Sequence, residues 1–211
     1  MKRRSRRLQD RLVWQAASLL LAYPDDGQQH RLEMVDQLLD YIAGTARGLL
    51  GETVAALRVQ DPIRAAATYV DTFDLRRRST MLLTYWTAGD TRNRGVQMLA
   101  FAQSYRSAGV EPPKREAPDH LPVVLEFAAT VDPEAGQRLL AAHRVPIDVL
   151  RQALVDTGSP YAPTVAAVAA TLPAPTEHDA DRLLRCGPPA ETVGLQPFQL
   201  TVPPRRAEGG L

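Results

Sequence analysis

Apolar residues recur at steps of three and four along most of the chain, which is the spacing of one face of an α-helix. They predict amphipathic helices in four stretches, with apolar positions running through residues 8–23, 32–42, 63–73 and 98–105. No stretch alternates apolar and polar residues between hairpin turns, so we expect no sheet. The predicted fold class is therefore all-α, a single-domain helical bundle.

Three dipeptides predict where helices begin. Asp61-Pro62, Asp132-Pro133 and Ser159-Pro160 each place a side-chain oxygen before a proline. The oxygen accepts hydrogen bonds from free N–H groups of the first turn, and proline fits that turn because no donor is needed there. Residues 111–115 form the only break that we expect in the body, a polar, proline-rich link between two helical halves.

The C-terminal part differs in composition. The 39 residues from Pro173 onward hold seven of the 17 prolines. Such a segment buries too little apolar surface to offset the entropy lost on ordering. We therefore divide the chain into a basic flexible arm (1–7), an all-α domain (8–172) and an irregular, Pro/Gly-rich tail (173–211).

Length and cysteine content exclude several kinds of site. With 211 residues, the chain is long enough to fold without a disulfide or a structural metal. The single cysteine, Cys186, excludes an intrachain disulfide and any cysteine-based metal cluster within one chain. The four histidines are scattered, and no glycine-rich phosphate-binding motif is present. We expect no metal site, no permanently bound cofactor and no enzymatic activity.

Charge is unevenly distributed. Residues 1–11 hold six basic groups and one acid, whereas the remaining 200 residues carry a net charge of −4. One hypothesis is a nucleic-acid or anionic-surface binder that uses the basic arm, and salt-dependent binding would be its signature. The acidic body argues against a face that binds duplex nucleic acid, so we expect no nucleic-acid partner.

Two segments superficially resemble membrane signals. Ser5-Arg6-Arg7-Leu8 is similar to the start of a twin-arginine leader, but polar and charged residues interrupt the apolar run that follows. Residues 157–176 are uncharged, yet they hold four prolines and too short an apolar run to span a bilayer. We expect a soluble cytoplasmic protein with no direct membrane insertion.

The first candidate site lies within residues 69–95, where aromatics, acids and arginines interleave at helical spacing. Arg92 and Arg94 would lie in the first turn of a helix capped by Asp90, where their charge opposes the helix dipole. A local conflict of this kind is expected at functional sites. The alternative is that the aromatics are core and the charges merely solvated. The candidates are Tyr69, Phe73, Leu82, Leu83, Tyr85, Trp86, Asp90, Arg92 and Arg94.

The second candidate site lies within residues 116–127. We expect Asp119 to cap a helix and Glu126 to lie near the same face as Asp119 and His120. One interpretation is that Asp119 only caps and that His120 is a half-exposed residue of the first turn. The other is an acidic, hydrogen-bonding rim, made of Glu116, Asp119, His120 and Glu126, at which a cationic peptide docks.

These two clusters resemble the NarJ branch of the TorD/DmsD-like chaperones, which are dedicated to molybdenum enzymes. The likeness covers roughly residues 8–172 and also includes residues 20–25 and 69–73. The likeness is specific because two motifs occur in the same order along the chain. The segment Leu82-Leu83-Thr84-Tyr85-Trp86 precedes the first of them. The motifs are Gly89-Asp90-Thr91-Arg92-Asn93-Arg94-Gly95 and Glu116-Ala117-Pro118-Asp119-His120-Leu121-Pro122.

The resemblance implies a non-catalytic chaperone of the respiratory nitrate reductase. Such a protein binds the N-terminal segment of the catalytic (alpha) subunit while the bis-guanine-dinucleotide molybdenum cofactor is inserted, before that subunit joins its membrane anchor. A helix-in-groove mode needs an apolar trough and a polar rim. We expect the trough at Leu82, Leu83, Tyr85 and Trp86, and the rim at Asp90, Asp119, His120 and Glu126.

A third hypothesis is an enzyme that builds or transfers the cofactor. The chain lacks a nucleotide-binding glycine motif, which argues against such an enzyme. Co-purification would discriminate the three hypotheses, because each predicts a different companion: a nitrate reductase subunit, nucleic acid or a cofactor intermediate.

Overall fold

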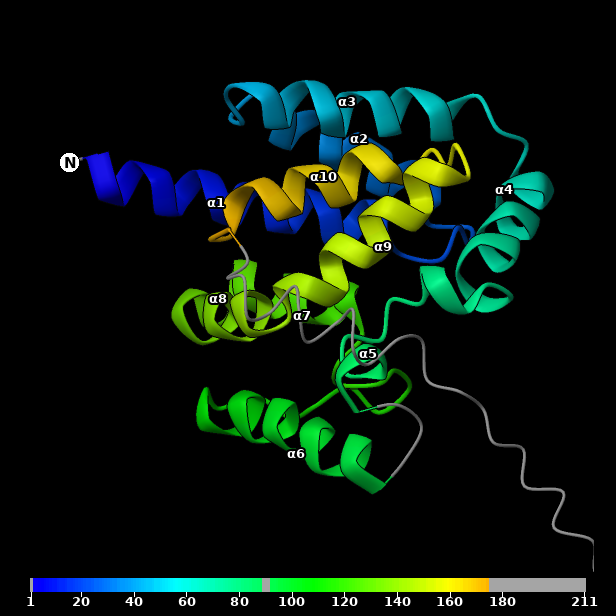
Figure 1. Ribbon diagram of the computed structural model, residues 1–211. Helices are drawn as coiled ribbons and strands as arrows, with labels where there is room; N and C mark the ends of the chain where they lie inside the picture. Colours follow the sequence, from blue (N-terminus) through cyan, green and yellow to red (C-terminus); the bar gives the residue numbers. More distant parts are fainter. Residues whose placement is uncertain (1, 89–91, 175–211) are drawn as a thin grey trace, which may run out of the picture.

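A computed structural model (Figure 1) describes the backbone of residues 2–88 and 92–174, and the side chains of residues 4–87 and 94–174. Its helices are α1 (Lys2–Leu20), α2 (Gln28–Leu39), α3 (Thr45–Arg58), α4 (Pro62–Tyr69), a π-helix η1 (Val70–Asp74), a 3₁₀-helix η2 (Arg77–Ser79), α5 (Tyr85–Ala88), α6 (Arg92–Ser107), α7 (Leu121–Thr130), α8 (Pro133–Ala142), α9 (Arg144–Asp156) and α10 (Ala162–Thr171). The described residues form no strand, only an isolated bridge between Leu82 and His120. The predicted all-α fold class is confirmed.

Helix α1 is the centre of the bundle. It packs against α7 on one side and against α2 and α10 on the other, while α3 covers α10 and α2 (Figure 1). Trp14 of α1 is buried, and its indole N–H donates to the Thr171 hydroxyl of α10 at 2.9 Å. One apolar core joins residues from α1 through α10. The described helices therefore form a single domain.

Two of the three predicted helix starts are confirmed. Asp61 accepts from the backbone N–H of Ile63 at 3.0 Å, and Asp132 accepts from that of Ala135 at 2.9 Å. The third is displaced, because α10 begins at Ala162 rather than at Pro160. The Ser159 hydroxyl still accepts from the N–H of Tyr161, so it caps a turn that precedes the helix.

The basic segment continues α1 instead of forming a separate flexible arm. The helix starts at Lys2, and residues 4–8 are exposed. Arg7 reaches Glu134 at the start of α8, with 2.9 Å between the two charged groups. Farther along, Arg11 donates to the Ala129 carbonyl at 2.8 Å. Both arginines tie α1 to the α7–α8 corner.

Helix α3 lies outside the stretches in which helices were predicted, and Gly44 precedes it. Gly44 adopts a positive φ of 69°, which glycine tolerates. Leu50, Val54 and Leu57 then lie buried on one side of α3. Their three- and four-residue spacing was the available signal for this helix.

The predicted polar link is confirmed, since no helix forms between the end of α6 and the start of α7 at Leu121. At the other end of the domain, α10 ends at Thr171 and the described chain continues to Ala174. The rest of the predicted tail lies outside the described residues. In the part of the chain that the structure covers, no helix is long and apolar enough to cross a membrane.

Candidate functional site

Several residues expected in an open trough are packed in the interior instead. Leu83 is 2% exposed, Trp86 is 7% exposed, and Tyr69 and Phe73 are each 5% exposed. Tyr69 packs on Phe73 with ring centroids 4.8 Å apart, and its hydroxyl donates to the Leu21 carbonyl at 3.0 Å. The expectation that Leu83 and Trp86 line an open trough is therefore corrected: their side chains fill the core because the neighbouring helices cover them.

Asp119 is fully buried, which corrects its expected roles as a helix cap and as a rim residue. Helix α7 is instead preceded by His120 at the capping position. The Asp119 carboxylate accepts from the Thr84 backbone N–H at 3.1 Å and from its hydroxyl at 2.5 Å. Its other oxygen lies 3.8 Å from the Arg94 guanidinium. Asp119 thus fastens the chain before α5, and the start of α6, to the start of α7.

Three of the predicted rim residues do reach the surface. Glu116 and Glu126 are exposed, and His120 is half-buried. The His120 Nδ1 lies 3.1 Å from a Glu116 carboxylate oxygen. Glu126 makes no ion pair with any residue whose side chain the structure describes.

The remaining predicted residues are less informative. Leu82 and Tyr85 are half-buried, and the Arg94 side chain is 19% exposed. Asp90 lies outside the described residues. Arg92 is the first residue of α6, but its side chain is also outside the described part.

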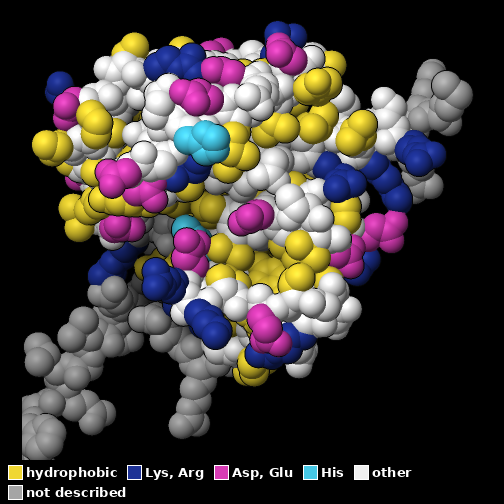
Figure 2. Space-filling view, turned by 180° about the vertical axis from the view of Figure 1, so that it is seen from behind, with side chains coloured by type: hydrophobic (Ala, Val, Ile, Leu, Met, Phe, Trp, Pro, Cys, Tyr) yellow, Lys and Arg dark blue, Asp and Glu magenta, His cyan; other side chains and the backbone are white. Residues whose placement is uncertain are grey.

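A groove of about 320 Å³ runs between α7 and the loop that follows α6. Its surface is mainly apolar, and three glutamates, Glu111, Glu116 and Glu126, lie between the apolar side chains. We call it the α7 groove, defined by Tyr105, Val110, Glu111, Pro113, Glu116, Val123, Glu126, Phe127, Thr130 and Val131. Figure 2 shows hydrophobic side chains around a hollow in the lower half of the molecule, where Figure 1 places α6 and α7, with acidic and basic side chains on either side.

The floor of the α7 groove is built across the contact between α6 and α7. Tyr105 of α6 packs against Phe127 of α7, with ring centroids 4.6 Å apart in an edge-on arrangement. Burial raises the pKa of the Tyr105 hydroxyl, so the group keeps its proton and donates it to the Pro118 carbonyl at 2.6 Å. Both contacts hold the ring in place, so the floor exists before any ligand arrives.

Two glutamates of this groove, Glu116 and Glu126, were among the predicted site residues, but its apolar floor was not predicted. Val123, Phe127 and Val131 recur at intervals of four, which places them along one side of α7. That spacing was the available signal. In the structure Phe127 is buried, whereas Val131 is 41% exposed.

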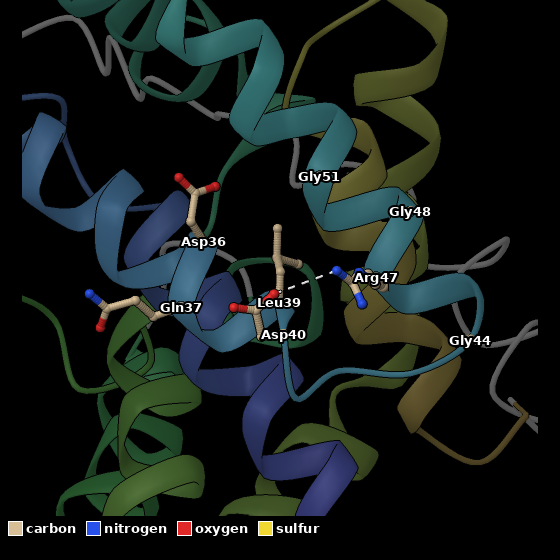
Figure 3. Close-up of a pocket in the computed structure, with 8 residues that line it drawn as sticks. All are labelled: Asp36, Gln37, Leu39, Asp40, Gly44, Arg47, Gly48 and Gly51. Carbon is tan, nitrogen blue, oxygen red and sulfur yellow. Dashed lines mark ion pairs between the residues drawn. The ribbon is translucent and has the colours of Figure 1, made fainter.

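A second and larger hollow of about 640 Å³ lies between α2 and α3 (Figure 3). We call it the α2–α3 pocket, defined by Asp36, Gln37, Leu39, Asp40, Gly44, Arg47, Gly48 and Gly51. Its charged groups are already paired, since Arg47 lies 3.6 Å from Asp40, and Asp36 pairs with Arg58, which lies outside the lining. Leu39 is the only large apolar side chain on its lining, so it offers little to an apolar ligand.

Neither hollow is arranged to hold a metal ion. Across the described side chains, no three His, Cys, Asp or Glu residues come together in a geometry that would bind one. The chemistry that the α7 groove offers is the burial of apolar surface, together with ionic hydrogen bonds from carboxylates. This chemistry suits a peptide with apolar and cationic side chains.

Comparison with known proteins identifies the family. Residues 28–167, about two thirds of the chain, match the family described as nitrate reductase delta subunit. The chain belongs to this family. The match begins at α2 and ends within α10, so it includes the whole α7 groove.

Nitrate reductase assembly chaperones are among its relatives. The probable nitrate reductase molybdenum cofactor assembly chaperone NarJ of Bacillus subtilis is 30% identical over 152 residues, which cover 72% of this chain and 83% of that one. The NarJ chaperone of Escherichia coli K12 is 35% identical over 115 residues, covering 53% of this chain and 49% of its own. The predicted resemblance to NarJ chaperones is confirmed.

A more similar relative is much longer. The nitrate reductase-like protein NarX of Mycobacterium tuberculosis is 62% identical over 160 residues, which are 76% of this chain but 24% of NarX. This chain therefore spans about a quarter of the NarX length. The 160 matched residues are therefore one part of a longer protein in NarX.

Proposed function

We propose that this protein is a cytoplasmic, non-catalytic assembly chaperone of a nitrate reductase. It binds the N-terminal segment of the catalytic (alpha) subunit and holds that subunit while the bis-guanine-dinucleotide molybdenum cofactor is inserted, before assembly at the membrane. The names of its NarJ relatives support the chaperone role. The observation that carries the binding step is the α7 groove, with its apolar floor and with Glu126, which makes no ion pair among the described side chains.

The groove suits an amphipathic helix with basic residues. Apolar side chains about two turns apart on such a helix would cover Val123 and Val131, and their removal from water favours binding by about 25 cal/mol per Å². A cationic side chain beside them would form a charge-assisted hydrogen bond with Glu126. Glu111 and Glu116 add negative potential along the same path.

The buried members of the predicted site have a supporting role in this proposal. Asp119 fixes the chain before α5 against α7, and Trp86 and Leu83 are buried. Substitutions at these positions would act through stability. Substitutions at Val123 and Glu126 would act through direct contact with the client.

Calorimetry with a synthetic peptide of the catalytic subunit's first residues tests the proposal. The full chain is expected to bind with a Kd in the micromolar range, with a negative heat-capacity change from apolar burial. Glu126→Lys and Val123→Asp should each weaken binding about tenfold or more. The matched control is Asp40→Lys in the α2–α3 pocket, which should leave the affinity unchanged.

Unfolding by urea is measured on the same samples to separate contact from stability. If Glu126→Lys and Asp40→Lys weaken peptide binding equally, the effect is general electrostatics and the α7 groove is not the site. If no heat is released at any peptide concentration, the proposed client segment is wrong.

The alternative of a nucleic-acid binder gains no support from the basic start of α1. Arg7 pairs with Glu134, and Arg11 is held by the Ala129 carbonyl, so two of its six basic groups are engaged by the body. We propose no nucleic-acid partner and no direct membrane insertion.

A further inference from the structure

We propose that residues 193–206 of this chain occupy the α7 groove when no client is bound, so that the tail limits client binding. This inference rests on the proposed function, because the tail and the client would compete for one surface. It concerns how client binding at this site is regulated. A client that binds better than the tail would displace the tail from the groove.

The tail segment has the chemistry that the groove selects. Its sequence is Val-Gly-Leu-Gln-Pro-Phe-Gln-Leu-Thr-Val-Pro-Pro-Arg-Arg, which contains no acid and ends in two cations. Phe198, Leu200 and Val202 alternate with polar residues, so one side of an extended chain would be apolar. Its three prolines oppose a helix and favour an extended form.

The charges of the groove are complementary to this segment. Glu126 has no ion-pair partner among the described side chains, so it is free to accept from Arg205 or Arg206. The other two glutamates are partly satisfied, since Glu111 lies 3.7 Å from Arg106 and Glu116 lies 3.1 Å from His120. The strongest attraction of the groove for a cation is therefore beside Glu126, next to the apolar floor formed by Val123 and Phe127.

The described chain ends close to the helices that build the groove. Arg144, the first residue of α9, donates to the Pro173 carbonyl at 2.6 Å and holds the start of the tail. The preceding residue, His143, packs on Phe101 of α6 with ring centroids 4.9 Å apart. Helix α6 also supplies Tyr105 to the groove floor.

The connecting chain is long enough to reach the groove. Residues 175–192 can span roughly 60 Å when extended. A domain of about 170 residues has a radius of gyration of about 16 Å, so any face is within reach. A tether of this kind gives an effective concentration on the order of 1 mM. A segment that alone bound with a Kd of about 0.1 mM would then weaken client binding roughly tenfold.

Calorimetry on full-length variants measures this competition. Phe198→Asp combined with Leu200→Asp removes the apolar side of the segment and should tighten binding of the client peptide about tenfold. The matched control places the same charges earlier in the tail, as Leu183→Asp combined with Leu184→Asp, and should leave the affinity unchanged. Equal client affinities in all three proteins would overturn the proposal.

Cross-linking measures tail docking without any client. The chain has two lysines, of which Lys114 lies in the loop beside the groove, and one cysteine that is replaced by Cys186→Ser. With Thr201→Cys, a short amine-to-thiol cross-linker should join residues 114 and 201 within the monomer. Adding Phe198→Asp and Leu200→Asp should abolish that product, and an undiminished product would also overturn the proposal.

The two measurements separate this inference from the proposed function. A cross-link that depends on Phe198 and Leu200, in a protein that binds no client peptide, supports tail docking and removes the proposed client. Tight client binding with no such cross-link supports the proposed function and removes the tail from the groove.

Discussion

The α7 groove and the α2–α3 pocket differ in what their side chains leave unsatisfied. The pocket is twice as large, but its acids already pair with Arg47 and Arg58, and its lining holds one large apolar side chain. The groove is smaller, yet it exposes apolar surface beside Glu126, which has no ion-pair partner among the side chains that the structure describes. The comparison teaches that size alone is a poor guide to a binding site, because binding needs interactions that the free protein has not already made.

The two hollows also differ in how firmly their walls are held. Behind the groove, α8 packs so closely on α7 that Gly136 lies against Ala128 with no room for another carbon. At the pocket, nothing lies within 4 Å of the place where a Gly48 side chain would project. The groove wall is therefore sensitive to small substitutions, and the pocket wall is tolerant of them.

The largest difference is expected for a pair of glycine substitutions. Gly136→Ala would place its Cβ 2.3 Å from the Ala128 Cβ, so α8 must move away from α7 and stability should fall by about 3 kcal/mol. Gly48→Ala should raise stability by about 0.5–1 kcal/mol, because alanine loses less backbone entropy in a helix. Urea unfolding of both variants measures the difference, and similar effects would contradict the contrast between the two walls.

Asp119→Ala should have the next largest effect. It leaves the buried N–H and hydroxyl of Thr84 without their acceptor, which costs about 2–3 kcal/mol. The measurement is again the free energy of unfolding. A variant as stable as the wild type would show that Asp119 does not hold the wall of the groove.

A smaller, pH-dependent effect is expected at His143, which lies beside α6. Burial lowers the pKa of this imidazole, although its hydrogen bond to the Leu139 carbonyl and the charge of Asp119 act in the opposite direction. Because the folded pKa lies below the unfolded value of about 6.5, the unfolded state binds more protons between the two values. This contribution to stability is complete above about pH 6.5 and is lost as the pH falls toward the folded pKa.

Melting temperatures between pH 5 and 8 test this expectation. His143→Gln should flatten the decline of stability toward acid pH, whereas His120→Gln should retain it. An unchanged acid slope in His143→Gln would show that other groups cause the decline.

The smallest effect is expected at the α2–α3 pocket. The Arg47–Asp40 pair is solvent-exposed, with both side chains more than half accessible, so Arg47→Ala should change stability by less than about 0.5 kcal/mol. It should also leave client affinity unchanged in calorimetry. A loss of affinity here would move the client site from the groove to the pocket.

Features that depend on neighbours in the sequence were predicted well. Asp61 and Asp132 cap their helices as expected, because both the acceptor and the N–H groups belong to the same few residues. The all-α class follows from apolar periodicity for the same reason. Glu126 is exposed on α7, whereas Asp119, which was expected near the same face, is buried.

What only the tertiary structure decided involves residues far apart in the chain. Asp119 has the local sequence of a helix cap, but its carboxylate binds Thr84, 35 residues earlier. Leu83 and Trp86 have the composition of a binding trough, yet neighbouring helices bury them. The sequence alone determined which residues are apolar and which helical faces they share. The tertiary structure determined which apolar residues remain exposed, because burial depends on contacts between helices that local spacing does not specify.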